Sequence, residues 1–289
     1  MILNDNLSER VEYSFRDYRA VICTGKSEIP AGFSDLSHWH EEIELLYILK
    51  GEISYNVNGE VCLLREGTGI FVNSKQLHFG FSDKAESCEH IVLLLHPDML
   101  CPAPELRERF VTPLLEQRGL AYRLLEDRGW QGEILALIRQ IFELRGTENG
   151  LLLIQSCFYR IWSLLFEHRF DEERPAEKDS HQVEAMRRML ALIRSEYAGE
   201  LSLRRIAEAG NISESLACRL FRGYVNTTPM AYVTEWRIRK SAELLRQTDV
   251  PITQIGCAVG FGDSSYFTKV FRRTMGCTPK EYRRNQTDA

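Results

Sequence analysis

The sequence predicts an α+β protein of two domains, an antiparallel β-barrel followed by a helical segment and then an all-α domain with two helix-turn-helix units. Three observations support this fold class. Short apolar segments separated by tight-turn residues fill positions 43–95, and helical patterns replace them from Asp98 onward. One helix-turn-helix pattern then occurs twice after position 200. At 289 residues the chain is long enough for two separate hydrophobic cores.

The expected strands of the first domain follow one another closely after a polar arm at residues 1–20. Asn58-Gly59 is a strong signal for a two-residue hairpin turn, because both residue types accept positive φ. Several short strands joined by tight turns favour a small antiparallel barrel. The strands are expected at 18–23, 43–49, 53–57, 61–64, 70–72 and 90–95.

Helices are expected at 105–117, 130–145 and 151–169, with loops at 119–129 and 146–150. The third helix carries more apolar residues than one buried stripe requires, so we expect it to contact a second subunit in a homodimer.

Residues 171–180 are charged, contain Pro175 and lack large apolar side chains, which is typical of a linker. We therefore expect domains at 1–170 and 181–289. Asp179, three residues before Gln182, is expected to cap the first helix of the second domain.

Charge is distributed unevenly along the chain. The net charge is −5, yet residues 181–289 hold 17 Lys and Arg against 11 Asp and Glu, a net +6, which leaves −11 for residues 1–180. This division favours DNA binding by the C-terminal part alone. The eight cysteines are widely spaced without a CxxC pair, and no membrane span or signal peptide is recognisable, so a cytoplasmic protein with reduced thiols is expected.

The clearest helix-turn-helix pattern lies at residues 249–284. A short apolar helix is expected at 251–259 with Pro251 in its first turn, and Gly260-Phe261-Gly262 interrupts it. Asp263 is expected to cap a second helix, which runs through Ser264, Tyr266, Phe267, Val270 and Phe271. The outward face of such a helix suits bases and phosphates in a major groove. It carries Ser264, Ser265, Thr268, Lys269, Arg272 and Arg273.

The same pattern occurs upstream. Ile206 matches Ile255 at an offset of 49 and Phe221 matches Phe271 at an offset of 50, so the second turn should be one residue longer. A helix capped by Thr228 and ending at Gln247 would join the units over about 28 Å at about 1.5 Å per residue. A repeat that keeps both the apolar and the basic face is a specific signal. The DNA-contact candidates of the first unit are Ser215, Cys218, Arg219 and Arg222.

These segments resemble the DNA-binding domain of the AraC/XylS family of bacterial transcription regulators, most closely at 212–215, 219–222, 237–245 and 259–273. The resemblance implies that Arg219 and Lys269 reach the major groove. It also implies that Arg222, Arg272 and Arg273 bind phosphate. Residues 216–218 are less polar than the family pattern, so the first recognition helix is expected to read few bases.

Gly32, His38, His40, Glu44 and Gly51 have the spacing G-x5-H-x-H-x3-E-x6-G, which resembles the first motif of the cupin superfamily. Gly67 and His78 fit its second motif, whereas Asn73, Lys75 and Ser82 depart from it.

The cupin resemblance implies that four side chains, His38, His40, Glu44 and His78, point into the barrel and could bind one Zn, Fe, Mn or Ni ion. The alternative is that they line an effector pocket without metal. The effector-binding candidates are His38, Trp39, His40, Glu44, Tyr55 and His78, and Tyr47 and Phe71 could add aromatic walls.

The sequence therefore predicts a dimeric, ligand-responsive transcription regulator without catalytic residues, whose partners are operator DNA, a small effector such as a sugar, and RNA polymerase. Two alternatives stay open. One is a metal-dependent cupin enzyme fused to a DNA-binding domain. The other is a constitutive DNA-binding protein with a structural barrel.

Overall fold

A computed structural model describes residues 2–3, 9–15, 18–28, 33–34, 37–82, 87–117, 119–170 and 180–287. The chain divides into two compact units, Met1–Val183 and Glu184–Ala289. Asp179 and all but the last residue of the expected linker lie outside the described residues, so the domain boundary at 171–180 stays a prediction. No described helix has the length and hydropathy needed to cross a bilayer.

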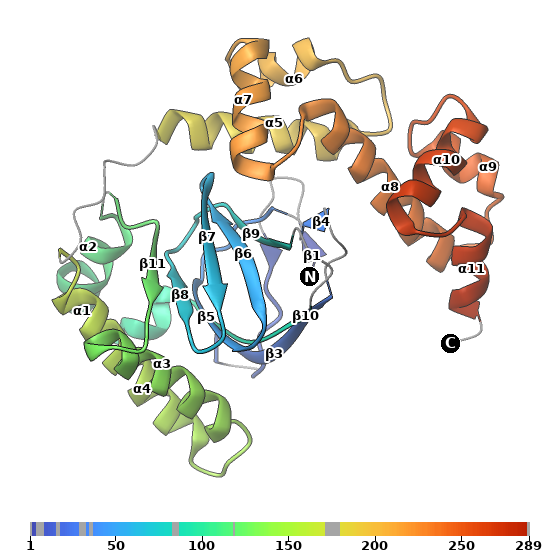
Figure 1. Cartoon of the computed structure of the whole chain (residues 1–289). Helices are drawn as coiled ribbons and strands as arrows, with labels where there is room; N and C mark the ends of the chain where they lie inside the picture. Colours follow the sequence, from blue (N-terminus) through green and yellow to red (C-terminus); the bar gives the residue numbers. More distant parts are fainter. Residues whose placement is uncertain are drawn as a thin grey trace. The chain divides into compact units, whose positions relative to one another are not determined.

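Two antiparallel sheets form the centre of the first unit (Figure 1). Five strands build the larger sheet in the order β11 (Tyr122–Leu125), β8 (Gly69–Val72), β5 (Ile43–Lys50), β10 (Ser87–Leu95) and β3 (Ala20–Glu28). Four strands build the smaller sheet in the order β4 (Phe33–Ser34), β9 (His78–Ser82), β6 (Glu52–Val57) and β7 (Glu60–Arg65). A short pair, β1 (Ile2–Leu3) and β2 (Glu9–Arg10), precedes both sheets.

The expected antiparallel barrel is not closed, because the described strands pair within two separate sheets, whereas the expected two-domain α+β class is confirmed. Strand β5 shows how this arrangement fills two cores. Leu45 and Tyr47 pack with the helices, whereas Leu46 and Ile48 pack with the second sheet. Successive side chains of a strand point to opposite faces, so β5 buries both. Short strands with tight turns are equally typical of a barrel and of two packed sheets, which is why the sequence could not distinguish them.

The predicted hairpin at Asn58-Gly59 is confirmed. It joins β6 to β7, Val57 pairs with Glu60, and φ is 50° at Asn58 and 81° at Gly59. The Asn56 side chain accepts a hydrogen bond from the Gly59 amide at 2.9 Å.

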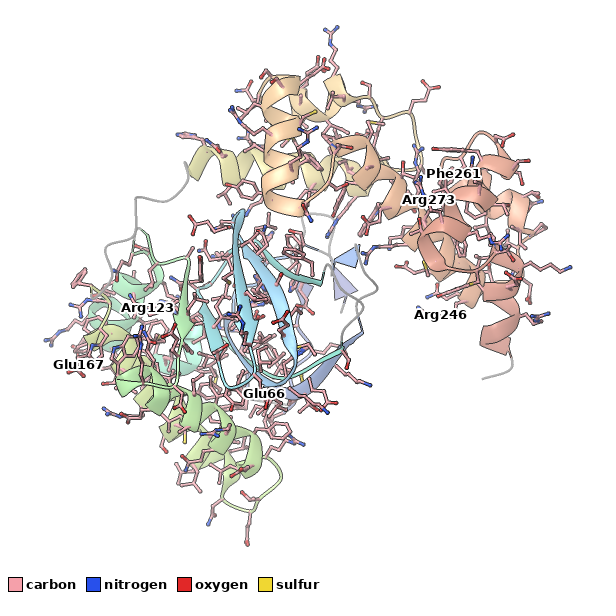
Figure 2. All side chains as sticks on the ribbon, in the orientation of Figure 1. Glu66, Arg123, Glu167, Arg246, Phe261 and Arg273 are labelled. Atoms are coloured by element: carbon pink, nitrogen blue, oxygen red, sulfur yellow. The ribbon has the colours of Figure 1, made fainter. Side chains whose placement is uncertain are left out.

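Two long helices, α3 (Gly129–Leu144) and α4 (Gly150–Glu167), pack against each other, and α3 also packs against the five-stranded sheet. Side chains fill the space between these layers (Figure 2). Ile134 and Ile138 of α3 and Phe158 of α4 are almost fully buried there.

The expected helix at 105–117 is broken into α1 (Pro104–Leu106), a π-helical turn η2 (Arg107–Val111) and α2 (Thr112–Leu115), after a 3-10 turn η1 (Pro97–Leu100). Pro113 has no amide hydrogen and its ring crowds the preceding turn, which explains the interruption. The expected loop at 119–129 contains β11, which the sequence analysis missed.

The second unit is entirely helical, and α8 (Pro229–Gln247) contacts the other helices of both helix-turn-helix units (Figure 1). The prediction for α8 is confirmed, because Thr228 Oγ1 accepts from the Ala231 amide at 3.3 Å, Pro229 is the first helical residue and Gln247 the last. The other helices are α5 (Ser180–Glu196), α6 (Leu203–Ala209), α7 (Glu214–Val225), α9 (Ile252–Ala258), α10 (Ser264–Met275) and α11 (Pro279–Thr287).

One detail of the second helix-turn-helix differs from expectation. Pro251 lies just before α9 as its N-cap, with φ −52° and ψ 137°, rather than within the first turn. The Pro ring fixes φ near this value, and the extended ψ keeps the residue outside the helix.

Candidate nucleic-acid interface and ligand site

The two helix-turn-helix units repeat one another in their helix ends. The Ser213 side chain accepts from the Leu216 amide at 3.3 Å at the start of α7. The Asp263 carboxylate accepts from the Tyr266 amide at 2.6 Å at the start of α10. Both helices end in a left-handed residue, Asn226 for α7 and Gly276 for α10. Both recognition helices are therefore capped within the free protein.

The aromatic packing behind the recognition helices also repeats. Phe221 and Tyr232 have ring centroids 5.8 Å apart with planes at 71°, and Phe271 and Tyr282 have centroids 5.6 Å apart with planes at 75°. The predicted difference in turn length is confirmed, since the first turn occupies 210–213 and the second 259–263.

Gly260 in the second turn lies close to a neighbouring segment of the backbone. Its φ is +92°, and a Cβ there would lie 2.8 Å from the carbonyl oxygen of Ala198. Arg237 of α8 lies beside it and donates hydrogen bonds to the carbonyls of Tyr197 and Gly199 at 2.7 and 2.8 Å. Arg237 thus links the loop after α5 to the second turn and is not a free DNA contact.

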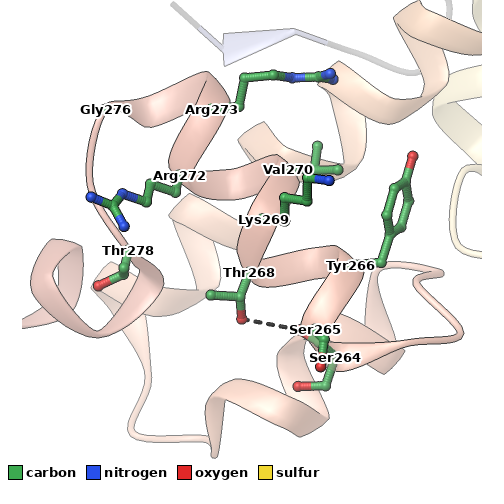
Figure 3. Close-up of a pocket in the computed structure, with 10 residues that line it drawn as sticks. All are labelled: Ser264, Ser265, Tyr266, Thr268, Lys269, Val270, Arg272, Arg273, Gly276 and Thr278. Atoms are coloured by element: carbon green, nitrogen blue, oxygen red, sulfur yellow. Dashed lines mark hydrogen bonds between the residues drawn. The ribbon is translucent and has the colours of Figure 1, made fainter.

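The outward faces of α7 and α10 present the predicted polar residues to solvent. Cys218 and Thr268 are half-buried, and the Thr268 hydroxyl donates to the Ser264 carbonyl at 3.0 Å. An open groove of about 970 Å³ follows α10 and is lined by all six candidates of that helix, together with Tyr266, Val270, Gly276 and Thr278 (Figure 3). The exposed candidates are Ser215, Arg219, Arg222, Ser264, Ser265, Lys269, Arg272 and Arg273.

The five candidate cations differ from other basic residues of this unit. Arg204 pairs with Glu208, Arg205 with Glu196 and Arg239 with Glu235. Within the described part of the chain, none of Arg219, Arg222, Lys269, Arg272 and Arg273 forms an ion pair with a carboxylate. Their charge is available to an anionic partner.

In the first unit, three predicted histidines come together at the ends of the strands. The ligating nitrogens of His38, His40 and His78 lie within 4.8 Å of one another. Glu44 Oε2 is 3.4 Å from His40 Nε2 and 3.3 Å from His78 Nε2. Tyr55 donates a 2.5 Å hydrogen bond to Glu44 Oε1. The structure therefore brings together five of the six predicted effector residues.

Backbone carbonyls orient two of these rings. His40 Nδ1 lies 3.0 Å from the Glu42 carbonyl, and His78 Nδ1 lies 2.9 Å from the Gln76 carbonyl. With each Nδ1 directed at a carbonyl, each Nε2 is directed at Glu44. His78 Nε2 is buried and close to Glu44, but is not aligned for a hydrogen bond. Three imidazoles and a carboxylate in this arrangement fit a divalent transition metal.

Burial and charge act in opposite directions on this cluster. Burial disfavours the charged Glu44 carboxylate, but the charge on His78 and the close contacts of His40 and His78 with the carboxylate outweigh it and hold the Glu44 pKa well below its usual value. Burial also disfavours charge on His40, but its contact with Glu44 raises the His40 pKa. The site is therefore a charge-compensated polar cluster inside the protein.

The remaining predicted residues take different places. Trp39 is half-buried, and its carbonyl accepts from the Glu9 amide at 2.8 Å. Tyr47 and Phe71 belong to the core beneath the helices, so the expectation that they wall the pocket is wrong. In β5, Tyr47 points to the face opposite Glu44 because the two are three residues apart. Gly32 lies outside the described residues.

Two acidic residues of the site were missed by sequence reasoning. Glu9 Oε2 of β2 is 3.5 Å from His38 Nε2, and burial raises the Glu9 pKa. Glu42 Oε2 is 3.8 Å from His40 Nδ1, and Tyr13 donates to Glu42 Oε1 at 2.6 Å. Glu9 lies in the arm at 1–20, which has no periodic pattern, so no local signal could have placed it at the histidines.

Comparison with known proteins gives the same two-part division. A helix-turn-helix domain family matches residues 206–285, and an AraC-like ligand binding domain family matches residues 30–161. An uncharacterized HTH-type transcriptional regulator, YdeC, from Bacillus subtilis is 31% identical over 98% of both chains. The melibiose operon regulatory protein of Escherichia coli K12 is 25% identical over 86% of this chain and 83% of its own.

Among solved structures, ToxT from Vibrio cholerae is 15% identical, covers 91% of this chain and 97% of its own, and gives a TM-score of 0.43. The family matches and the full-length relative lead to one conclusion: this chain belongs to the AraC family of helix-turn-helix transcription regulators, with a ligand-binding domain preceding its DNA-binding domain.

Proposed function

We propose that α7 and α10 each place one face in a major groove of operator DNA, with Arg219 and Lys269 reaching into the groove and Arg222, Arg272 and Arg273 at phosphates. The observation that carries this proposal is the set of five cations that form no ion pair with a described carboxylate, on equivalent faces of two capped helices. Ser215, Cys218, Ser264, Ser265 and Thr268 lie beside the bases. Cations free of carboxylates can neutralise phosphates and release counterions.

The effector binds at the cluster of His38, His40, Glu44, Tyr55 and His78. A carboxylate, three imidazoles and a phenol supply both donors and acceptors, which suits a small polyhydroxylated molecule. One relative is named for the melibiose operon, and melibiose is a sugar. We therefore assign the effector to the sugars or to related small polar metabolites.

A divalent Zn, Fe, Mn or Ni ion is proposed as a companion of that effector, held by His38, His40, Glu44 and His78 and supported by the approach of their ligating atoms. The ion would supply a Lewis-acid contact for an oxygen of the bound molecule. The same cluster supports the second candidate function, a metal-dependent cupin enzyme fused to a DNA-binding domain. If the effector is recovered chemically unchanged after prolonged incubation with the protein and metal, that alternative is rejected.

The active form is proposed to be a cytoplasmic homodimer that contacts RNA polymerase at the promoter. Leu151, Leu152 and Leu153 at the start of α4 are 43%, 76% and 44% exposed, and exposed leucines of this kind would be buried by contact with a second copy. The effector would then act by favouring one arrangement of the two DNA-binding domains in the dimer.

The test uses the full-length protein. Thermal unfolding is recorded against a panel of sugars and other metabolites, each with and without divalent metal, and any molecule that raises the midpoint is carried into operator-binding measurements. An effector that changes DNA affinity supports a responsive regulator. Equal affinity with and without every stabilising molecule would support the constitutive alternative.

A further inference from the structure

Tyr266 is an exposed aromatic residue on the second recognition helix. Its neighbour Phe267 is fully buried, yet 55% of Tyr266 remains exposed. The ring lines the same groove as Ser265 and Lys269, and it projects from the helix beside them (Figure 3). An apolar surface thus lies among the polar candidates for DNA contact.

The ring is held in place from two sides. The Asp263 carboxylate accepts from the Tyr266 amide at 2.6 Å, which fixes the backbone of the first turn. The ring also lies against buried Phe261, with centroids 6.0 Å apart and planes at 56°. An aromatic side chain has few torsions to immobilise, so fixing this ring against a partner costs little entropy.

The first recognition helix has an apolar residue at the equivalent position. Leu216 is the third residue of α7, its amide donates to the Ser213 side chain at 3.3 Å, and the side chain is half-buried. Both helices therefore present a serine, then an apolar side chain, and then a cation three positions later. Ser215, Leu216 and Arg219 correspond to Ser265, Tyr266 and Lys269.

Resting on the proposed placement of α10 in the major groove, we propose that Tyr266 is a specificity-determining residue whose ring packs against the C5-methyl group of a thymine. The thymine methyl is the apolar group that a base pair offers in the major groove. The first residues of a recognition helix are those that approach base edges. Leu216 makes the corresponding methyl contact from α7.

The experiment begins with selection of duplexes from randomised DNA by the full-length protein. Each thymine of the selected duplex is then replaced singly by deoxyuridine, which lacks only the methyl group. We expect an affinity loss of about fourfold at the thymine that Tyr266 contacts, the value of one buried methyl group. Tyr266→Ala should bind the thymine and deoxyuridine duplexes equally at that position, while Tyr266→Phe should keep the wild-type difference.

Leu216→Ala is the matched variant of the other repeat and should remove methyl sensitivity at a different thymine. Two results would overturn the inference. In the first, Tyr266→Ala keeps full methyl sensitivity at every position. In the second, Tyr266→Phe loses as much DNA affinity as Tyr266→Ala, which would assign the contact to the hydroxyl and a phosphate. Failure of the wild-type protein to enrich any sequence would instead reject the proposed DNA reading itself. Should Tyr266→Ala unfold, Tyr266→Ser takes its place as the variant without a ring, with the same expected loss of methyl sensitivity.

Discussion

At the scale of single residues, the two recognition helices use different cations at equivalent positions. Arg219 follows Leu216, Ala217 and Cys218 along α7, whereas Ser265 and Thr268 precede Lys269 along α10. A guanidinium can bond both acceptors of a guanine edge, and an ammonium acts mainly as a point charge. We therefore assign base reading to Arg219 and electrostatic anchoring to Lys269.

Arg219→Ala should relax the preference at one or two base pairs, each worth about 1–3 kcal/mol of discrimination. Lys269→Ala should weaken binding evenly across sequences and lower the slope of log affinity against log salt by about one. Selection from randomised operators and a salt series measure both effects. Arg128→Ala, which removes an exposed guanidinium from the other unit, is the control. A changed sequence preference in Lys269→Ala together with an unchanged one in Arg219→Ala would reverse the assignment.

The Tyr55 hydroxyl stabilises a buried charge. It donates to Glu44, whose carboxylate is enclosed and ionised. Because hydrogen bonds to charged groups contribute about 1.5–3 kcal/mol, Tyr55→Phe should lower the free energy of unfolding by that amount. Urea denaturation measures it. Tyr159→Phe, which removes a hydroxyl from a residue 39% exposed on α4, should change stability by less than about 0.5 kcal/mol. Equal effects of the two variants would contradict the role given to Tyr55.

At the scale of elements, the turn between α9 and α10 determines how the second helix-turn-helix is built. Its left-handed residue Gly260 packs against the Ala198 carbonyl and beside the Arg237 guanidinium. Arg237 in turn bonds two carbonyls of the loop after α5. This turn therefore joins three segments that are distant in the sequence.

Gly260→Ala should destabilise the protein by about 1–3 kcal/mol, because the new Cβ meets a strained φ and a backbone oxygen. Gly262→Ala is the matched control. Gly262 lies two residues away in the same turn, and a Cβ there meets open space without positive φ. We expect Gly262→Ala to change the free energy of unfolding by less than about 0.5 kcal/mol, as surface substitutions usually do. Comparable losses from both substitutions would show that the close approach at Gly260 is unimportant.

At the scale of the whole molecule, the apolar start of α4 predicts self-association. Leu152 is 76% exposed between two exposed leucines. Leu152→Glu would bury a charge in a dimer interface and should convert the full-length protein to a monomer at tens of micromolar in sedimentation. Val61→Glu, which alters another exposed apolar side chain, 58% exposed on β7, should remain dimeric. A wild-type protein that sediments as a monomer at that concentration would remove the dimer from the mechanism.

Sequence alone predicted the second unit well, because helix caps, periodicity and the repeat are local signals. Thr228, Asp263 and the longer second turn all lie where the pattern placed them. The sequence analysis missed features that depend on contacts between residues distant in the sequence. Strand β11 is defined by its pairing with β8, and Glu9 reaches His38 only through the fold. The separation into two sheets likewise depends on which strand edges meet, which no single segment encodes.

The capped ends of α7 and α10 have a thermodynamic consequence. Ser213 and Asn226 close one helix, and Asp263 and Gly276 close the other, before DNA is present. Binding then carries no cost for forming these helices, and its heat-capacity change should reflect docking rather than coupled folding. The recognition helices α7 and α10 are thus already formed without DNA. Control by an effector must therefore act on the position of the DNA-binding domains rather than on the folding of these helices.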